Sequence, residues 1–314
     1  MPAEVFGPSY AFLPRAELLN YEEIALVAAS LVQLGARTLR VTGGEPLVRR
    51  NLGSLIAILR SLDDTADLNG ERLDLAMTTN GSLLKDLAAS LRIAGLDRVT
   101  VSLDSLKEDT FAKMSGSALP LRNVLEGIAA ASAAGFKGIK LNAVVRRGFN
   151  EGEIPALVEF ARTRGHTLRL IEYMDVGTAN GWHLEEVVPA SEMIQRIDAV
   201  HPIEPISASR PGEVANRYRY RDGAGEVGII ASVTAPFCKD CTRVRVTADG
   251  RLYTCLFAAT GSDLRPFLRP HPSPAGLLRA LRGIWEGRSD RYSEMRDAET
   301  PHRFPKVEMF RVGG

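Results

Sequence analysis

The sequence predicts an α/β fold in which helices cover parallel strands, arranged either as a barrel or as an open doubly wound sheet. Two observations support this prediction. Short runs rich in Val, Leu and Ile alternate with helix-length amphipathic segments, and each short run ends in small or polar residues. The chain also has 314 residues, of which 45% are hydrophobic, so it can bury a large core.

The first predicted helix covers residues 20–35, where Ile24, Val27 and Leu31 share one face. Asn20 is its expected N-cap, and Glu23 stands three residues later, at the spacing of a capping box. The predicted strands are TLRVTGG from residue 38, LDLAMTTNG from 73, RVTVSLDS from 98, IKLNAVVR from 139 and LRLIEYMD from 168. The helices between them are predicted at 51–62, 83–95, 121–135 and 153–165, and the last three end at a glycine, as helix C-termini often do.

The pattern changes near residue 205. Residues 205–233 are typical of loops and short strands, and residues 274–287 again predict a helix. We therefore predict two units, residues 1–200 and residues 201–314.

Unusual residues close the predicted strands, where functional groups of parallel α/β folds gather. The first strand ends in Gly43-Gly44-Glu45-Pro46, which would let a ligand approach the backbone but is equally typical of a tight turn. Thr78 and Ser102 close the second and third strands, where they could bind a ligand or cap a helix.

Two charged residues, Lys140 and Arg169, lie inside apolar strand segments. A buried charge needs a partner. An anion bound inside the barrel would supply one, and an internal Asp or Glu is the alternative.

All the cysteines of the sequence, Cys238, Cys241 and Cys255, lie in one short span. A disulfide uses two thiols and a closed zinc site uses four ligands. The spacing alone leaves two candidates, a catalytic zinc site and an iron–sulfur cluster with one iron not held by protein. Arg243 and Arg245 follow Cys241, and in an extended segment they would project to the same side.

The composition narrows the classes of partner. The formal net charge of +1 gives no strong attraction to nucleic acid or to an anionic membrane. The sequence contains no apolar run long enough to cross a bilayer and no signal-peptide pattern at its start. We expect a cytoplasmic protein that binds neither nucleic acid nor membrane.

Several of these motifs together resemble the GTP 3',8-cyclase family, radical S-adenosylmethionine enzymes that begin molybdenum cofactor synthesis. They are the GGEP, TTNG and VSLDS strand ends, IEYMDVG, the CKDCTRVR…C arrangement and the terminal Gly313-Gly314. The resemblance is collinear from Met1 to Gly314. It implies an incomplete TIM-like (β/α)6 radical SAM barrel lacking its first strand over residues 1–200, and a cluster-binding region over residues 201–314.

The resemblance also implies ligands for particular residues, although it assigns no catalytic residue. The three cysteines would hold a [4Fe–4S] cluster by three irons and leave the fourth open to the guanine ring. Residues implied to bind S-adenosylmethionine are Gly44, Ser102 and Met174. Residues implied to bind GTP are Arg40, Thr78, Lys140, Arg243, Val244 and Arg245, with Arg169 as a weaker candidate. The Gly-Gly tail would return toward the active site.

Family members carry a further CxxxCxxC motif, which holds a second [4Fe–4S] cluster that cleaves S-adenosylmethionine. Its last cysteine directly precedes a Met-Pro pair. This sequence starts at Met1-Pro2 and contains no such motif. Two interpretations follow, of which the resemblance favours the first: an enzyme whose start has been assigned too late, or a GTP-binding protein with a single cluster and no radical catalysis. Another radical enzyme with an auxiliary cluster is a third possibility.

For the enzyme, the resemblance implies conversion of GTP to (8S)-3',8-cyclo-7,8-dihydroguanosine 5'-triphosphate. A 5'-deoxyadenosyl radical would abstract hydrogen from the ribose C3'. The implied partners are GTP, S-adenosylmethionine and, downstream, cyclic pyranopterin monophosphate synthase. A homodimer is compatible with the sequence.

Overall fold

The structure is a computed structural model that describes residues 13–64, 70–176, 181–296, 307 and 313. The helices are α1 (Tyr21–Gln33), α2 (Leu52–Arg60), α3 (Leu84–Ile93), α4 (Glu108–Ser115), α5 (Leu121–Ala133), α6 (Ile154–Thr163), α7 (Ala190–Asp198) and α8 (Pro274–Glu286). The strands are β1 (Thr38–Val41), β2 (Asp74–Thr79), β3 (Arg98–Ser102), β4 (Lys140–Val145), β5 (Thr167–Glu172), β6 (Ile203–Ile206), β7 (Asn216–Tyr220), β8 (Glu226–Ile230), β9 (Arg245–Val246), β10 (Arg251–Tyr253) and β11 (Ser262–Asp263).

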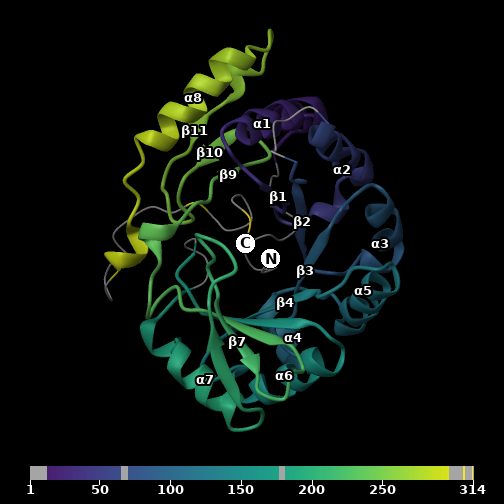
Figure 1. Ribbon diagram of the computed structural model, residues 1–314, viewed down its shortest axis with the longest axis vertical. Helices are drawn as coiled ribbons and strands as arrows, with labels where there is room; N and C mark the ends of the chain where they lie inside the picture. The colour runs from purple at the N-terminus through teal and green to yellow at the C-terminus, as the bar shows by residue number, and fades with distance from the viewer. Residues whose placement is uncertain (1–12, 65–69, 177–180, 297–306, 308–312, 314) are drawn as a thin grey trace.

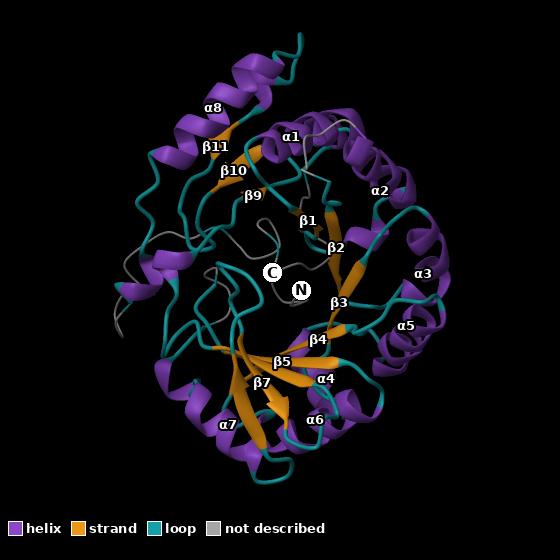
Figure 2. Ribbon diagram, viewed as in Figure 1, coloured by secondary structure: helices purple, strands orange, loops and turns teal. Residues whose placement is uncertain are grey.

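One sheet of eight strands organises the fold, in the order β1-β2-β3-β4-β5-β8-β7-β6. Neighbouring strands are parallel from β1 to β5 and on to β8, whereas β7 and β6 add antiparallel pairs. The sheet curves, and helices such as α2, α3, α5 and α6 lie outside it (Figures 1 and 2). The predicted α/β fold with an incomplete TIM-like barrel is confirmed, and β1 and β6 are the edge strands of the described sheet.

The helix boundaries follow from local chemistry. Asn20 caps α1: its side chain accepts from the amide of Glu23 at 2.8 Å, and the Glu23 carboxylate accepts from the amide of Asn20 at 2.8 Å. The predicted capping box is therefore confirmed. The glycines predicted to end α3, α5 and α6 are Gly95, Gly135 and Gly165, and they follow these helices with φ of 105°, 87° and 66°. This left-handed conformation favours glycine and terminates a helix.

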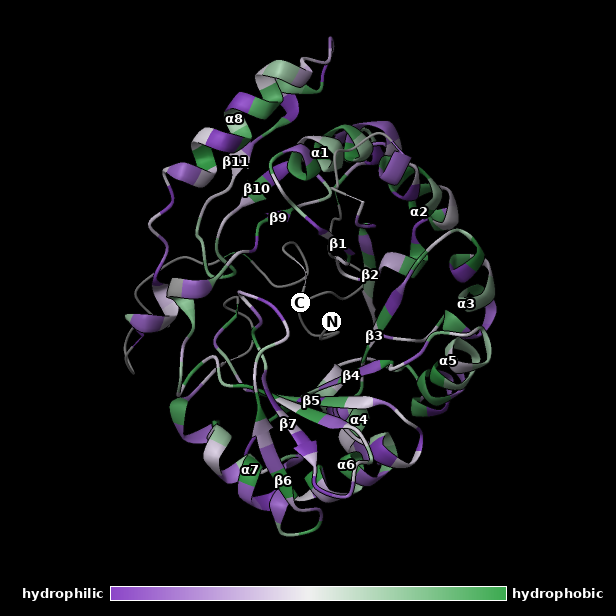
Figure 3. Ribbon diagram, viewed as in Figure 1, coloured by the Kyte–Doolittle hydropathy of each residue, from purple (hydrophilic) through white to green (hydrophobic). Residues whose placement is uncertain are grey.

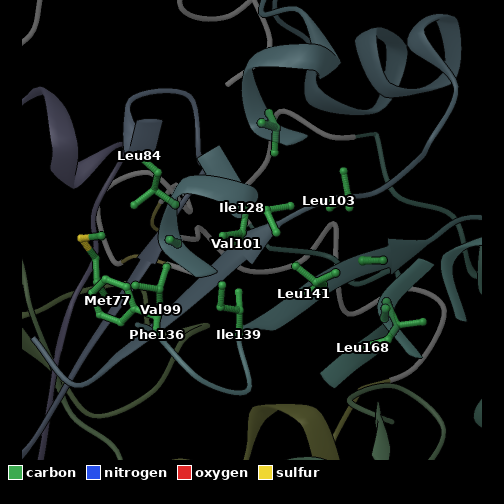
Figure 4. Close-up of a cluster of buried hydrophobic side chains, with 14 of the residues drawn as sticks. Met77, Leu84, Val99, Val101, Leu103, Ile128, Phe136, Ile139, Leu141 and Leu168 are labelled. Carbon is green, nitrogen blue, oxygen red and sulfur yellow. The ribbon is translucent and has the colours of Figure 1, made fainter. Parts of the chain in front are cut away.

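The hydrophobic core lies between the sheet and its outer helices. On β2, β3 and β4 the residues that face the helices are buried and mostly apolar, for example Met77, Val101 and Leu141. They pack with helix residues such as Leu84 and Ile128, as Figure 4 shows. Because successive strand residues point to opposite faces, the remaining residues of these strands line the inner face of the sheet, and many of them are polar and only partly buried.

A second core joins α8 to α1. It includes Val27 of α1, Leu252 of β10 and Leu277 and Leu281 of α8. Hydrophobic and hydrophilic residues alternate along α8, as expected for a helix with one buried face (Figure 3). The described sheet crosses residue 200, because β6, β7 and β8 belong to the same sheet as β1–β5. The division into residues 1–200 and 201–314 remains a prediction.

A buried carboxylate fixes the end of β5. Glu172 is fully buried. It accepts from the amides of Ala190, Val233 and Thr234 at 2.9, 2.7 and 2.8 Å, and from the Thr234 hydroxyl. It therefore joins β5 to the start of α7 and to the segment that follows β8.

In the part of the chain that the structure describes, no helix combines the length and the apolar character needed to cross a membrane.

Candidate functional site

Four cationic side chains lie on one face of the parallel strands. Arg40 of β1 is in register with Ala76, and Ala76 is in register with Arg98 of β3. Lys140 of β4 is in register with Thr100. Arg169 of β5 is in register with Asn142, two residues beyond Lys140. Residues in register on parallel strands share a face, so these cations all point away from the helix-covered side. We call Arg40, Arg98, Lys140 and Arg169 the inner basic cluster.

Hydroxyl and amide groups orient two members of this cluster. The Arg40 guanidinium donates to the Thr78 hydroxyl at 3.0 Å and to the Thr100 hydroxyl at 3.3 Å. The Arg169 guanidinium donates from Nε to the Asn142 side-chain oxygen at 3.1 Å. The structure therefore brings the predicted residues Arg40 and Thr78 into direct contact.

Burial and mutual repulsion act on these cations. Burial, followed by the charges of neighbouring arginines beginning with Arg169, lowers the pKa of Lys140 from 10.5 to about 8. Burial, with the charge of Arg98 next, lowers the pKa of Arg40 to about 10. For Arg169, burial followed by the charge of Arg40 lowers the pKa to about 10. The cluster thus holds more positive charge than its surroundings stabilise.

Acidic side chains neutralise only part of this charge. Asp74 accepts two hydrogen bonds from Arg98, and its carboxylate lies 3.8 Å from a nitrogen of Arg210. It therefore neutralises part of the charge of these two arginines. Among the described residues, no carboxylate forms an ion pair with Arg40, Lys140 or Arg169, although the charge of Glu213 does act on Arg169. Of the two partners left open for Lys140, the internal Asp or Glu is not found in the described structure.

The residues expected to bind S-adenosylmethionine lie at or just beyond the carboxyl ends of their strands. Gly44 follows β1 and is exposed, Ser102 is the exposed last residue of β3, and Met174 follows β5. In contrast, Arg98 and Lys140 are the first residues of β3 and β4. The two groups are nevertheless close at one point, because Ser102 is in register with Asn142 and Asn142 is in register with Arg169. Among the GTP candidates, Thr78 is also next to the carboxyl end of its strand, whereas Lys140 begins β4.

The Gly-Gly-Glu-Pro turn is fixed by its glutamate. The Glu45 carboxylate accepts from the amide of Leu47 at 2.9 Å, from the Thr79 hydroxyl at 2.7 Å and from the amide of Asn80 at 2.7 Å. Because this carboxylate is engaged by β2 and by its own turn, the backbone at Gly43 and Gly44 is the part of the turn left to face a ligand. A side chain at Gly43 would meet no atom within 4 Å, so the space beside it is open.

A second carboxylate lies just beyond β3. Asp104 accepts from the amide of Val144 at 2.8 Å, and burial raises its pKa to about 6. It lies two residues from Ser102 and therefore borders the same carboxyl end of the sheet.

The first glycine of the C-terminal pair, Gly313, lies at this end as well. Gly313 is buried with φ of 70°, and a Cβ placed on it would lie 2.4 Å from Cγ2 of Thr42, the residue that follows β1. Gly313 therefore packs directly beside the Gly43-Gly44 turn, where a larger residue would not fit. Gly314 lies outside the described residues.

The three cysteines lie on neighbouring segments. Cys238 begins a 3-10 turn (Cys238–Asp240), and the amide of Cys241 donates to the Cys238 carbonyl at 3.3 Å. Cys255 follows β10, which pairs with β9 through Tyr253 and Arg245. All three thiols are free and partly buried. The pairing of β9 with β10 therefore brings the Cys238–Cys241 segment and the Cys255 segment to the same end of this small sheet.

Positive charge surrounds the Cys241 thiol. The Arg243 guanidinium donates to the Cys241 sulfur at 3.5 Å. Burial acts to raise the pKa of Cys241, but Arg243 and Arg245 outweigh it and leave the pKa below its usual value. At Cys255, burial raises the pKa. Val244, between these two arginines in the sequence, is partly buried. In the described structure, no hydrogen bond or ion pair joins Arg243 or Arg245 to the inner basic cluster.

The thiols suit an iron–sulfur cluster in number and in chemistry. Three soft thiolate ligands would bind three irons of such a cluster and leave the fourth without a protein ligand, and the nearby cations favour the thiolate form. Within the described residues, however, the three side chains do not converge as a group of His, Cys, Asp or Glu ligands that could hold a metal ion. The donor set fits a cluster, whereas its geometry in the described structure is not that of a closed metal site.

Arg98, Arg210 and Asp74 escaped the sequence analysis. A signal for Arg98 was present, because it begins the apolar strand RVTVS as Lys140 begins KLNAVV. Arg210 lies in the loop between β6 and β7, where nothing in the local sequence points toward the barrel.

Comparison with known families and proteins identifies two adjoining family regions. The Radical SAM superfamily model matches residues 6–161, and the Molybdenum Cofactor Synthesis C model matches residues 166–294. A GTP 3',8-cyclase of Acidothermus cellulolyticus is 54% identical over 94% of this chain and 81% of that protein. A GTP 3',8-cyclase of Xanthomonas axonopodis pv. citri is 48% identical over 100% of this chain and 91% of that protein.

Solved structures agree at the level of the fold. Streptococcus suis SuiB has a TM-score of 0.55 and 12% identity, covering 85% of this chain and 59% of that chain. Native anSMEcpe with bound AdoMet has a TM-score of 0.52 and 13% identity, covering 78% of this chain and 68% of that chain. The extensive identity to the two cyclases, together with both family regions, shows that the chain belongs to the GTP 3',8-cyclase family of the radical SAM superfamily.

Proposed function

We propose that the inner basic cluster binds the triphosphate of GTP. The observation that carries this proposal is a set of cations on the inner face of the barrel for which the described residues supply too few carboxylates. A triphosphate would neutralise Arg40, Lys140 and Arg169, which form no ion pair with a described carboxylate. Thr78, Thr100 and Asn142 hold the two guanidinium groups in place before the ligand arrives.

The guanine end of GTP would then point toward the cysteine segment. Arg243, Val244 and Arg245 are proposed to contact the substrate there, and Cys238, Cys241 and Cys255 are proposed to hold a [4Fe–4S] cluster by three irons. Such a cluster supplies an open iron site for a nitrogen or oxygen of the base. The arginines beside Cys241 support this assignment because they favour the thiolate form that binds iron.

S-adenosylmethionine is proposed to bind at the carboxyl ends of the strands. Membership of the radical SAM superfamily implies this cofactor and a [4Fe–4S] cluster. Gly44 offers exposed backbone, Ser102 an exposed hydroxyl and Met174 backbone groups at the end of β5. When bound, the cofactor and its cluster supply the radical that begins cyclisation. The chain's own part is to hold the ribose of GTP beside the proposed S-adenosylmethionine site.

The proposed reaction is cyclisation of GTP to (8S)-3',8-cyclo-7,8-dihydroguanosine 5'-triphosphate, which cyclic pyranopterin monophosphate synthase would consume. One observation favours a second candidate, a GTP-binding protein with a single cluster: the sequence as given contains three cysteines, which suffice for one three-thiolate set. Incubation with GTP, S-adenosylmethionine and a strong reductant separates the two. Formation of 5'-deoxyadenosine and cyclised product supports the enzyme, and GTP binding without either supports the second candidate.

Titration calorimetry tests the nucleotide site directly on the full chain with iron and sulfide supplied under anaerobic conditions. GTP should bind more tightly than ATP, because the proposed cysteine segment reads the base. Exchange of Arg40 for Met should weaken both nucleotides, since this side chain is proposed to contact phosphate. Exchange of the exposed Lys137 for Met provides a control for loss of one positive charge on the same part of the chain. Equal affinity for GTP and ATP would contradict recognition of guanine.

A further inference from the structure

A buried polar group connects the end of β5 to the C-terminal part of the described chain. Asp175 and Arg296 have side chains that are 1% and 4% exposed, and Arg296 Nε lies 2.8 Å from Asp175 Oδ1. The Tyr292 hydroxyl donates to Asp175 Oδ2 at 2.6 Å. The Arg296 guanidinium also donates to the carbonyl of Ser232, beyond β8, at 2.8 Å.

An aromatic stack continues this group toward a cysteine. The rings of Phe257 and Tyr292 stack with centroids 4.6 Å apart and an angle of 15° between their planes. The Arg296 guanidinium lies 4.9 Å from the centroid of Phe257 and 5.6 Å from that of Tyr292. The amide of Phe257 donates to the Cys255 sulfur at 3.4 Å. A continuous set of contacts therefore runs from Asp175 to the Cys255 thiol.

The two ends of this set lie in two proposed sites. Asp175 follows Met174 at the carboxyl end of β5, the region proposed for S-adenosylmethionine. Cys255 belongs to the segment proposed to hold iron. The contacts would therefore fix the distance between the cofactor region and the cluster, with the substrate between them.

We propose that Asp175, Tyr292 and Arg296 are positioning residues that hold the Cys255 segment in place relative to the carboxyl end of β5. This inference rests on the proposed role of Cys255 as a cluster ligand. A buried ion pair adds little net stability, because the cost of desolvation offsets the attraction. The hydrogen bonds from Tyr292 to Asp175 and from Arg296 to the Ser232 carbonyl instead fix which parts of the chain lie together. The Phe257 ring packs against Tyr292, and the Phe257 amide holds the Cys255 thiol by a hydrogen bond.

Differential alkylation of the full chain tests the inference before any cluster is present. Iodoacetamide would be applied to the iron-free protein, and the rates at Cys238 and Cys255 would be measured by peptide mass spectrometry. In Tyr292→Phe, which removes one hydroxyl from the contact with Asp175, the rate at Cys255 should rise about tenfold, as expected for loss of a hydrogen bond to a carboxylate. The rate at Cys238 should stay unchanged.

Tyr21→Phe is the matched control, because it removes a hydroxyl that donates at 2.7 Å to the carbonyl of Arg50, far along the chain from the cysteines. It should alter neither rate. Phe257→Leu provides a second variant that keeps the ion pair and breaks the stack, and it should accelerate Cys255 in the same way. An unchanged rate at Cys255 in both variants would overturn the inference, as would an equal acceleration of Cys238 and Cys255, which would indicate general loosening.

The reconstituted protein gives an independent reading. GTP should change the electron paramagnetic resonance spectrum of the reduced cluster in the unsubstituted protein and in Tyr21→Phe, and should change it less in Tyr292→Phe. Identical changes in all three proteins would overturn the positioning role. If the unsubstituted protein assembles no cluster, the proposed function fails, while the alkylation rates still decide whether the contacts position Cys255.

Discussion

Replacing Lys140 with Met should raise the stability of the free protein and weaken its binding of GTP. The two effects have one cause. In the folded protein Lys140 is partly buried among arginines, and its pKa falls from 10.5 to about 8. The folded state thus disfavours the charged ammonium, whereas an anionic ligand would favour it. Met keeps a side chain of similar length without the charge.

The size of the stability effect follows from the pKa. A difference of 2.5 between 10.5 and about 8 corresponds at full value to about 3.4 kcal/mol. Lys140 is partly exposed, so screening by solvent reduces this to about 1–2 kcal/mol. For a chain of this size we expect the Tm to rise by about 2–4 °C. Loss of one charged contact to phosphate should cost about 1.5–3 kcal/mol, or about 10- to 150-fold in Kd.

The pH dependence distinguishes this explanation from a better-packed core. Below pH 8 Lys140 is charged in both the folded and the unfolded state, so its cost is fully present. Between pH 8 and 10.5 the folded state loses the proton first, and the stability of the unsubstituted protein rises relative to that of the variant. Above pH 10.5 the advantage of Met should disappear.

Thermal unfolding at pH 7 and pH 9.5, together with titration calorimetry with GTP at pH 7, provides the test. Lys137→Met serves as the control, because Lys137 is exposed and lies three residues earlier. The reasoning would be refuted if Lys140→Met were less stable than the unsubstituted protein at pH 7, or if it bound GTP with unchanged affinity.

Three further outcomes are expected. Gly313→Ala places a Cβ 2.4 Å from the Thr42 methyl group at a φ of 70°, so carboxypeptidase should remove the C-terminus faster than in the unsubstituted protein. Adding Thr42→Ser should partly reverse this effect. Equal cleavage rates for Gly313→Ala and the unsubstituted protein would contradict the contact. Asp104→Asn should raise the Tm at pH 7 but not at pH 3.5. Burial raises the pKa of Asp104 from 3.8 to about 6, so the buried carboxylate destabilises the fold only at pH values where it is ionised. A gain in Tm at both pH values would indicate better packing instead. Glu172→Gln replaces an acceptor of four hydrogen bonds and should lower the free energy of unfolding in urea by about 2–4 kcal/mol, a loss that an unchanged denaturation midpoint would disprove.

Local patterns were sufficient to predict most of the barrel. The five predicted strands correspond to β1–β5, and the capping box of α1 formed as its spacing indicated. The region after residue 205 was harder to predict, because β7 and β8 join the sheet of β1–β5 through a mixture of antiparallel and parallel pairs. Strand order across such a region depends on which edges meet in space, which the periodicity of a single strand does not contain.

For the candidate site, the sequence indicated some of the residues but not the contacts that they make. Lys140 and Arg169 stood out because each is a charge inside an apolar segment, and the structure places both on the inner face. Their pairing was not predictable. Asp74, which lies in an equally apolar segment, neutralises Arg98 and leaves Lys140 without a carboxylate among the described residues. The choice depends on strand register, and a shift of one residue would reverse which side chains face inward.

The sequence by itself determined the alternation of β1–β5 with α1, α2, α3, α5 and α6, the glycine ends of three of these helices and the chemical types of the candidate ligands, because each depends on residues a few positions apart. It did not predict α4 or α7. Only the tertiary structure decided that Tyr292 donates to Asp175, 117 positions away, and that Gly313 packs against Thr42. Contacts between such distant segments form when surfaces of separate elements are buried together. Burial of these surfaces offsets the entropy lost on closing the chain between them, and no local sequence pattern shows which surfaces will meet.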